Sequence, residues 1–112
     1  MKPGHRMHKG ASLRIVAPEL PDEASDTVRA TVLEIAAVQS GNPRKGHATA
    51  LMHQVCGEAD RNAKVLMLMV TENADELVKW YRKFGFKPTK DALDTPVVMV
   101  RAPEALRIVR AA

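Results

Sequence analysis

The sequence has 112 residues, of which 46% are hydrophobic and 27% charged, proportions that exclude a disordered chain and are typical of one folded domain. Seventeen Lys and Arg residues against thirteen Asp and Glu residues leave a net charge of +4, which favours an anionic partner. All the aromatic residues lie between Trp80 and Phe86, whereas proteins that bind single-stranded nucleic acid spread stacking aromatics over a basic surface. Nucleic acid is therefore not the expected partner.

The sequence shows neither a membrane segment nor a secretion signal. No apolar run approaches the roughly 20 residues that cross a bilayer, and no signal-peptide pattern opens the chain. Cys56 has no second cysteine with which to form an internal disulfide, as is usual in a reducing compartment. We therefore expect a cytoplasmic protein with no membrane association.

The first residues carry no apolar pattern. Residues 1–11 are basic and contain glycine and proline, so a flexible basic tail is predicted. His5 and His8 lie in this tail, but two histidines are too few for a metal site, and no metal is expected. A short strand is predicted over Leu13–Ala17, followed by a loop or a helical turn over Asp22–Asp26.

A strand, a helix and a second strand are predicted next. Residues 30–38 are almost all apolar, as in a strand covered on both faces, and Glu34 is the exception. A helix begins near Ala48, and Lys64–Val70 is a second apolar strand. Short connections between such elements imply a right-handed crossover and parallel pairing of the two strands. The buried stripe of the helix is predicted to be Leu51, Met52, Val55, Cys56 and Ala59.

A second helix is predicted after the second strand. Asn73, with Glu76 three residues later, predicts a capping box at its start, and Gly85 supplies a left-handed residue at its end. A last strand is predicted over Thr95–Arg101 and a closing helix over Pro103–Arg110. The fold class is therefore α/β, with a mixed central sheet and two main helices. The apolar stripe of the second helix is predicted to be Leu77, Val78, Tyr81 and Phe84.

The junction between the first apolar strand and its helix carries the strongest chemical signal. The first turn of a helix presents unpaired N–H groups, where phosphates bind if the backbone can come close. Gly46 and Ala48 keep that approach open, and Arg44, Lys45 and His47 add donors. The sequence matches neither a Walker loop nor the glycine pattern of dinucleotide-binding folds. It predicts an anion-binding loop, with a turn of merely solvated basic side chains as the alternative.

The order of motifs along the chain resembles the GNAT family of acyl-CoA-dependent N-acetyltransferases over about residues 30–101. The motifs are a strand ending at Val38, Gly46-x-Ala48 opening a helix, a buried strand, Asn73, and Tyr81-x-x-x-Gly85-Phe86. The sequence departs from the family in three places, one of which is the spacing of eight residues from Asn73 to Tyr81, one more than expected. Pro43 and Arg44 replace an arginine and a glycine, and only residues 1–29 precede the central strand, where the family has two helices and two or three strands. The resemblance implies a GNAT-like fold with a splayed parallel strand pair and a reduced N-terminal half. Residues 12–112 would then form a single acyl-CoA-binding domain.

The resemblance also implies how acetyl-CoA would be bound. The backbone amide near Val38 would stabilise the charge that develops on the thioester oxygen. The pyrophosphate would bind the amides of residues 44–49, and Asn73 would contact the cofactor arm, although its role as a helix cap already explains its presence. The implied cofactor-binding residues are Val38, Arg44, Lys45, Gly46, His47, Ala48, Thr49 and Asn73.

Tyr81 and Glu34 are the candidate catalytic residues. By resemblance, Tyr81 gives a proton to the departing thiolate; the alternative is that it packs on the sheet with its hydroxyl bonded to a carbonyl. Glu34 is the candidate general base, because a carboxylate in an apolar strand needs a cleft or a partner. Its alternative is a rim position paired with Arg14 or Arg29. Glu34 lies four residues before Val38, so the strand period predicts that the two share a face.

The predicted function is direct transfer of an acetyl group from acetyl-CoA to an amine, carried by a small molecule or by a protein. The alternative is a non-catalytic GNAT-like module that binds CoA or another protein. Because so little chain precedes the central strand, and because the sheet edge near Leu13–Ala17 would lie uncovered, we also expect a homodimer.

Overall fold

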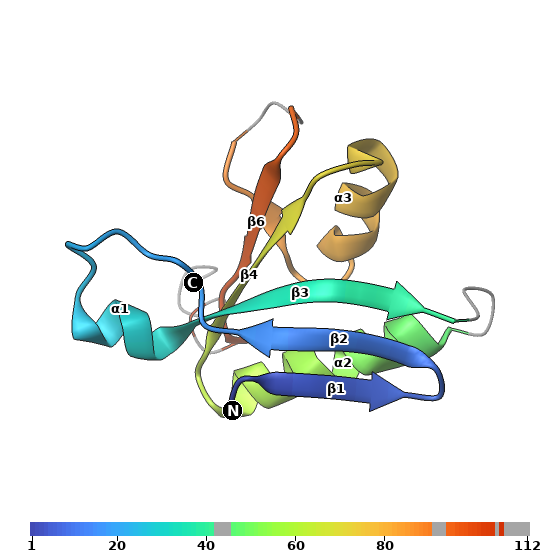
Figure 1. Ribbon diagram of the computed structural model, residues 1–112, viewed down its shortest axis with the longest axis horizontal. Coiled ribbons are helices and arrows are strands. Elements are labelled where there is room, and N and C mark those ends of the chain that lie inside the picture. The colour runs from blue at the N-terminus through green and yellow to red at the C-terminus, as the bar shows by residue number, and fades with distance from the viewer. Residues whose placement is uncertain (42–45, 91–93, 105, 107–112) are drawn as a thin grey trace.

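The computed structural model describes residues 1–41, 46–90, 94–104 and 106, which form a six-stranded mixed sheet and three helices (Figure 1). The strands lie in the order β1-β2-β3-β4-β6-β5, and all neighbours are antiparallel except β3 and β4. The predicted mixed sheet and its parallel pair are therefore confirmed. The elements are β1 (Gly4–His8), β2 (Ala11–Val16), α1 (Asp26–Thr31), β3 (Val32–Ser40), α2 (His47–Arg61), β4 (Val65–Val70), α3 (Ala74–Arg82), β5 (Lys87–Pro88) and β6 (Val97–Arg101).

The first residues form a hairpin, so the prediction of a tail without structure over residues 1–11 is wrong. β1 pairs with β2 from Gly4–Ile15 to His8–Ala11. The two residues between the strands, Lys9 and Gly10, have φ of 49° and 90°, and positive φ at both positions is what a type I′ hairpin turn requires. The sequence shows no alternation of apolar residues that would predict this strand, because β1 is mostly exposed and is held by backbone hydrogen bonds.

This hairpin also changes the edge of the sheet. β2 pairs with β1 on one side and with β3 on the other, so the edge that was expected to lie uncovered at residues 13–17 is occupied by β1. One of the two reasons for expecting a homodimer therefore does not hold.

A short helix, α1, precedes the central strand. Residues 26–31 are helical, and β3 begins at Val32 rather than at residue 30. Ser25 caps the helix, because its Oγ accepts a hydrogen bond of 3.2 Å from the amide of Val28. Ala30 and Thr31 were assigned to the strand because apolar and β-branched residues there continue the pattern of β3 without a break.

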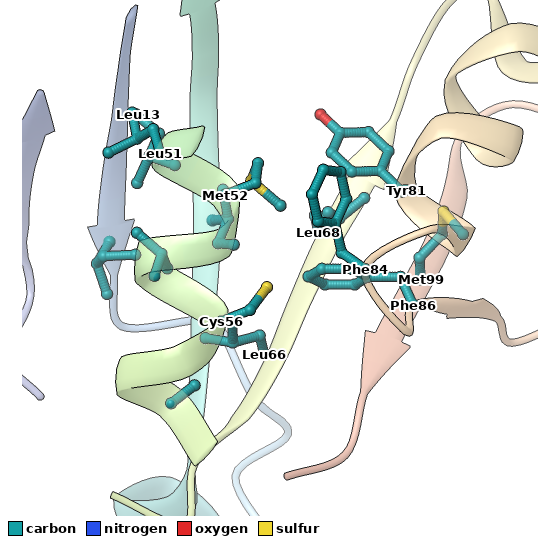
Figure 2. Close-up of a cluster of buried hydrophobic side chains, with 14 of the residues drawn as sticks. Leu13, Leu51, Met52, Cys56, Leu66, Leu68, Tyr81, Phe84, Phe86 and Met99 are labelled. Atoms are coloured by element: carbon teal, nitrogen blue, oxygen red, sulfur yellow. The ribbon is translucent and has the colours of Figure 1, made fainter. Parts of the chain in front are cut away.

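One face of the sheet carries the core, and both long helices contribute to it. The predicted stripe of α2 is confirmed residue by residue, and it packs against inward-facing side chains of β2, β3 and β4. Phe84, just after α3, joins the same core, and its ring lies 5.0 Å from the ring of His53 on α2. Figure 2 shows side chains from α2 converging with Leu68, Tyr81 and Phe86.

The opposite face of the sheet is more open. The side chains that alternate with the core residues on β4 and β6 are half-buried or exposed, and Met69 is 52% exposed. Strand alternation places Val65, Met67, Val98 and Val100 on this face with Met69.

The ends of α3 were predicted in part. Gly85 has φ of 95°, as predicted for the residue that follows the helix. Asn73 is the N-cap residue, but it is itself left-handed and makes no side-chain hydrogen bond to the helix, so the predicted capping box with Glu76 is wrong. The predicted helix over residues 103–110 falls mostly outside the described residues.

A buried ion pair ties three elements together at one end of the sheet. The guanidinium of Arg101, at the end of β6, donates two hydrogen bonds of 2.9 Å to the carboxylate oxygens of Asp60 on α2. Its Nε donates to the carbonyl oxygen of Phe84, at 2.6 Å, just after α3. The Arg101 side chain is only 5% exposed, so the charge depends on Asp60 for compensation.

Asp60→Ala is expected to lower the free energy of unfolding by about 3–5 kcal/mol, because it leaves a buried guanidinium without its carboxylate. Glu58→Ala is the matched control on the same helix. Glu58 pairs with Arg6 at 3.6 Å, and the two side chains are 32% and 27% exposed, so its loss should cost less than about 1 kcal/mol. Urea denaturation measures both, and equal effects would contradict the assignment.

Candidate active site

Strands β3 and β4 pair over only three residues and then part. Residues 32–34 of β3 pair with residues 65–67 of β4. Beyond them β3 continues beside β2 to Ser40, whereas β4 continues beside β6 to Val70, and the two strands diverge (Figure 1). Residues 35–38 therefore have no paired strand on their β4 side within the described chain, which confirms the predicted splayed pair.

A β-bulge lies in β3 where the strands have parted. Ser12 pairs with Gln39, and Arg14 pairs with Ala36. The three residue steps from Ala36 to Gln39 in β3 therefore lie opposite only two residue steps in β2, so β3 contains one extra residue. Ala37 takes the extra position with φ of 54°, in the left-handed region that residues other than glycine rarely adopt.

The bulge reverses which side chains of β3 face the helices. Before it, Leu33 and Ile35 are buried in the core; after it, Val38 packs against the core. Glu34 therefore lies on the opposite face from Val38. The prediction that these two residues share a face is wrong. Side chains alternate between the two faces along a strand, and the extra residue of the bulge reverses that alternation between Glu34 and Val38.

A cleft of about 390 Å³ occupies the space between the parted strands. Its lining comes from residues 34–38 of β3, from residues 68–72 at the end of β4 and just beyond it, and from Leu77 and Tyr81 of α3. Both strands run toward this edge of the sheet, and α2 and α3 follow their ends. Ligands of open α/β sheets bind at such an edge, where the connections between parallel strands diverge.

Tyr81 reaches the cleft from the helix side. Its side chain is buried among the rings of Trp80 and Phe86, at centroid distances of 5.0 and 5.9 Å, and the residue is 8% exposed. Its hydroxyl oxygen points away from the phenylalanine side chains (Figure 2) and has no hydrogen-bond partner within the described residues. The alternative interpretation, a hydroxyl satisfied by a carbonyl, is therefore not observed. Burial raises the pKa of Tyr81 above its usual value near 10, so the phenol keeps its proton at neutral pH.

The titration of Tyr81 can be measured directly, because it is the single tyrosine of the chain. The tyrosinate absorbance in the near ultraviolet should appear with a midpoint above pH 10 in the folded protein and near 10 in denaturant. Because the folded pKa is the higher one, this group's contribution to stability is complete below pH 10 and is lost as the pH rises through the folded pKa. A midpoint at or below 10 in the folded protein would contradict the burial argument.

Glu34 lies at the point where the strands part. It is half-buried, and it faces Met67 of β4 and Val16 of β2 in the sheet register. Its carboxylate makes no ion pair in the described part of the chain, and Arg29 instead donates a hydrogen bond of 2.7 Å to the carbonyl oxygen of Pro21. The alternative of a rim carboxylate paired with Arg14 or Arg29 is therefore not what the structure has. Glu34 lines the cleft instead.

The predicted anion-binding loop is described only from Gly46 onward, and Arg44 and Lys45 lie outside the described residues. Gly46 is the N-cap of α2, with φ of 71°, and its carbonyl accepts the amide of Ala50 at 3.0 Å. No side chain caps the helix, so the amides of residues 47–49 have no acceptor within it. His47 Nδ1 is also buried without a hydrogen-bond partner among the described residues.

The sequence did not indicate every residue of the cleft. Glu72 lines it from the segment between β4 and α3, and Asn73 is the residue after it. A signal was present, because Glu72 lies two residues after the carboxyl end of the parallel strand β4, in the region where side chains of α/β folds meet ligands. Asn73 makes no contact that supports or contradicts its implied cofactor role.

Among the described residues no helix is long and apolar enough to cross a bilayer. The mixed sheet, the cleft between its parallel strands and the uncapped start of α2 together define an α/β domain with a candidate ligand-binding site.

Comparisons with known proteins identify the family. Residues 23–95 match the family model of the GNAT acetyltransferase domain, which is more than half of the chain. The chain therefore belongs to the GNAT acetyltransferase family, and the resemblance drawn from the motifs is confirmed. None of the curated proteins matches the sequence.

A solved structure shows the same fold. The crystal structure of the anti-CRISPR protein AcrVA5 is similar with a TM-score of 0.63 and 14% sequence identity. The similarity covers 91% of this chain and 100% of that chain. At this identity the likeness concerns the fold alone. The chain therefore has the same overall fold as that structure over nearly its whole length.

Proposed function

We propose that the protein transfers an acetyl group from acetyl-CoA directly to an amine. The observation that carries the proposal is the cleft between β3 and β4, which a protonated Tyr81 reaches from the helix face and Glu34 lines from the opposite face. In such an arrangement the thioester and the amine can approach each other through the sheet from its two sides. Membership of an acetyltransferase family supports the same reaction class.

The start of α2 is the proposed site for the pyrophosphate of CoA. The amides of residues 47–49, which have no acceptor within the helix, and the positive end of the helix dipole favour an anion there. An added Cβ at Gly46 would meet no atom of the described residues within 4 Å, which leaves room for a ligand in front of this turn. Arg44 and Lys45 would add charge from the preceding loop.

The proposed chemistry needs two proton acceptors and one donor. Glu34 takes a proton from the ammonium, and the resulting amine attacks the thioester carbonyl carbon. The oxygen that gains charge is stabilised by a backbone amide near Val38, beside the bulge. The carbon–sulfur bond then breaks, the nitrogen loses a second proton to solvent, and Tyr81 protonates the thiolate before recovering its own proton from water.

Gly46→Asp should abolish the rise in melting temperature that acetyl-CoA gives the wild type, because a carboxylate would face the pyrophosphate. The matched control is Gly46→Asn, which has the same size and tolerates the left-handed backbone but carries no charge. A thermal shift that is equal in wild type and Gly46→Asp would remove this loop from the site.

Tyr81→Phe should lower kcat by roughly 10²–10⁴-fold while leaving the affinity for CoA nearly unchanged, because only the proton donor is lost. Glu34→Gln should lower turnover most at low pH, where the amine is fully protonated, and its defect should shrink as the pH rises. Single-turnover measurements of thiol release give both rates.

The outcome also separates the two candidate functions. If acetyl-CoA protects the protein but no amine is acetylated, the non-catalytic CoA-binding alternative holds. If acetylation proceeds and neither substitution changes its rate, the proposed catalytic roles are wrong.

A further inference from the structure

The face of β4 and β6 that points away from the long helices is entirely apolar. Strand alternation places five residues of the two strands on it, namely Val65, Met67, Met69, Val98 and Val100. A strand of an antiparallel sheet with one face in water normally alternates apolar residues with polar ones. Here the positions that should be polar are all apolar, as in strands that are covered on both faces.

No element of the described chain covers this surface, which we call the open face. α2 and α3 both contribute to the core on the other side of the sheet, and α1 has no buried residue. Met69 is 52% exposed, and its four neighbours on the open face are half-buried. Contiguous apolar surface left in contact with water is typical of a site of protein association.

Two opposite charges flank the apolar residues in a single row across the sheet. Glu34 of β3 pairs with Met67 of β4. Met67 also pairs with Val100 of β6, which in turn pairs with Lys87 of β5. Residues that pair directly share a face, so all four side chains lie on the open face. Within the described residues, neither Glu34 nor Lys87 makes an ion pair or a side-chain hydrogen bond.

A row with an acid at one end, a base at the other and two apolar residues between them is complementary to itself. Self-complementarity is what an interface between two identical subunits requires. We infer that a second copy of this chain packs its open face against the first, about a two-fold axis that runs parallel to the strands between β4 and β6. This axis lays β6 of one copy over β4 of the other, and β5 over β3.

The proposed axis brings the two charges together. Met67 faces the partner's Val100, Glu34 faces the partner's Lys87, and each contact occurs twice by symmetry. Packed sheets lie about 10 Å apart, a distance that a glutamate and a lysine side chain span together.

The second copy covers Glu34 on the face from which the proposed reaction receives its amine. Dimer formation and acceptor binding therefore exclude each other on the open face, and the monomer is the form that is open to an acceptor. The dimer itself does not rest on the proposed reaction. Its tests measure association alone, so a failure of the dimer and a failure of acetyl transfer are distinguishable.

Sedimentation equilibrium of the full chain tests the dimer. The mass of the wild type should rise with concentration from 12.3 kDa to twice that value. Met69→Lys should raise the dissociation constant roughly tenfold or more, because it buries an unpaired charge against the partner's Val98. The matched control is Met7→Lys. Met7 is 68% exposed on the same side of the sheet, but it lies on β1, beyond the last strand of the partner, so association should not change.

Two results of that experiment would overturn the inference. One is a wild type that stays at 12.3 kDa from micromolar to near-millimolar concentration. The other is an equal dissociation constant for Met69→Lys and Met7→Lys.

Exchange of the two charges tests the contact itself. Lys87→Glu alone and Glu34→Lys alone should each weaken association roughly tenfold or more, because like charges then face each other twice in the dimer. The double variant restores opposite charges, so its dissociation constant should return to within about twofold of the wild-type value. Within one chain β4 and β6 separate the two residues, so this recovery reports a contact between copies. Circular dichroism shows whether each variant is folded, and a folded double variant that associates as weakly as the single ones would overturn the inference.

Discussion

The structure depends on the pairing of β3 and β4 with two further strands. Each of the two stays hydrogen-bonded to its own antiparallel partner beyond the point where they pair with each other. β3 stays beside β2 as far as Ser40, and β4 stays beside β6 as far as Val70. The two strands can therefore share only residues 32–34 and 65–67 before they part. The sheet divides into halves, β1-β2-β3 and β4-β6-β5, and the cleft is the space between them. The bulge at Ala37 fits this division, because a bulge bends and twists its strand away from its former course.

The two halves are held together at the end where they still pair. α2 packs across β1 to β4, and its last turn presents Asp60 to Arg101 of β6. Arg101 pairs in the sheet with Leu66, which itself lies opposite Leu33 in the short parallel ladder. The buried ion pair therefore lies beside the closed end of the sheet, and the cleft lies at the open end. This arrangement lets backbone groups and polar side chains face a ligand at one end without loosening the core at the other.

Features set by local sequence were predictable, and features set by backbone geometry were not. The stripe of α2 and the exit residue Gly85 follow from helical spacing and from the conformational freedom of glycine, and both are confirmed. β1 was missed because an exposed edge strand is held by backbone hydrogen bonds and needs no apolar pattern. The bulge at Ala37 was missed because alanine gives no sign of a positive φ, and the error then placed Glu34 and Val38 on one face. The position of Glu72 in the site was not predicted, because Glu72 lines a cleft that exists only where β3 and β4 part.

The open face of β4 and β6 bears on how the proposed reaction can select its acceptor. In the described part of the chain, one hairpin and α1 precede β3, and the face of β4 and β6 that carries Met67, Met69, Val98 and Val100 is half-buried to exposed. An open face places few steric limits on the body of an acceptor, since the described residues leave this face half-buried to exposed. Of the two carboxylates that line the cleft, Glu34 lies at its closed end, where β3 and β4 still pair, and Glu72 lies in the exposed segment after β4. Charge acts over a longer range than packing contacts, so on such an open face the two carboxylates steer an approaching ligand more than the shape of the wall does.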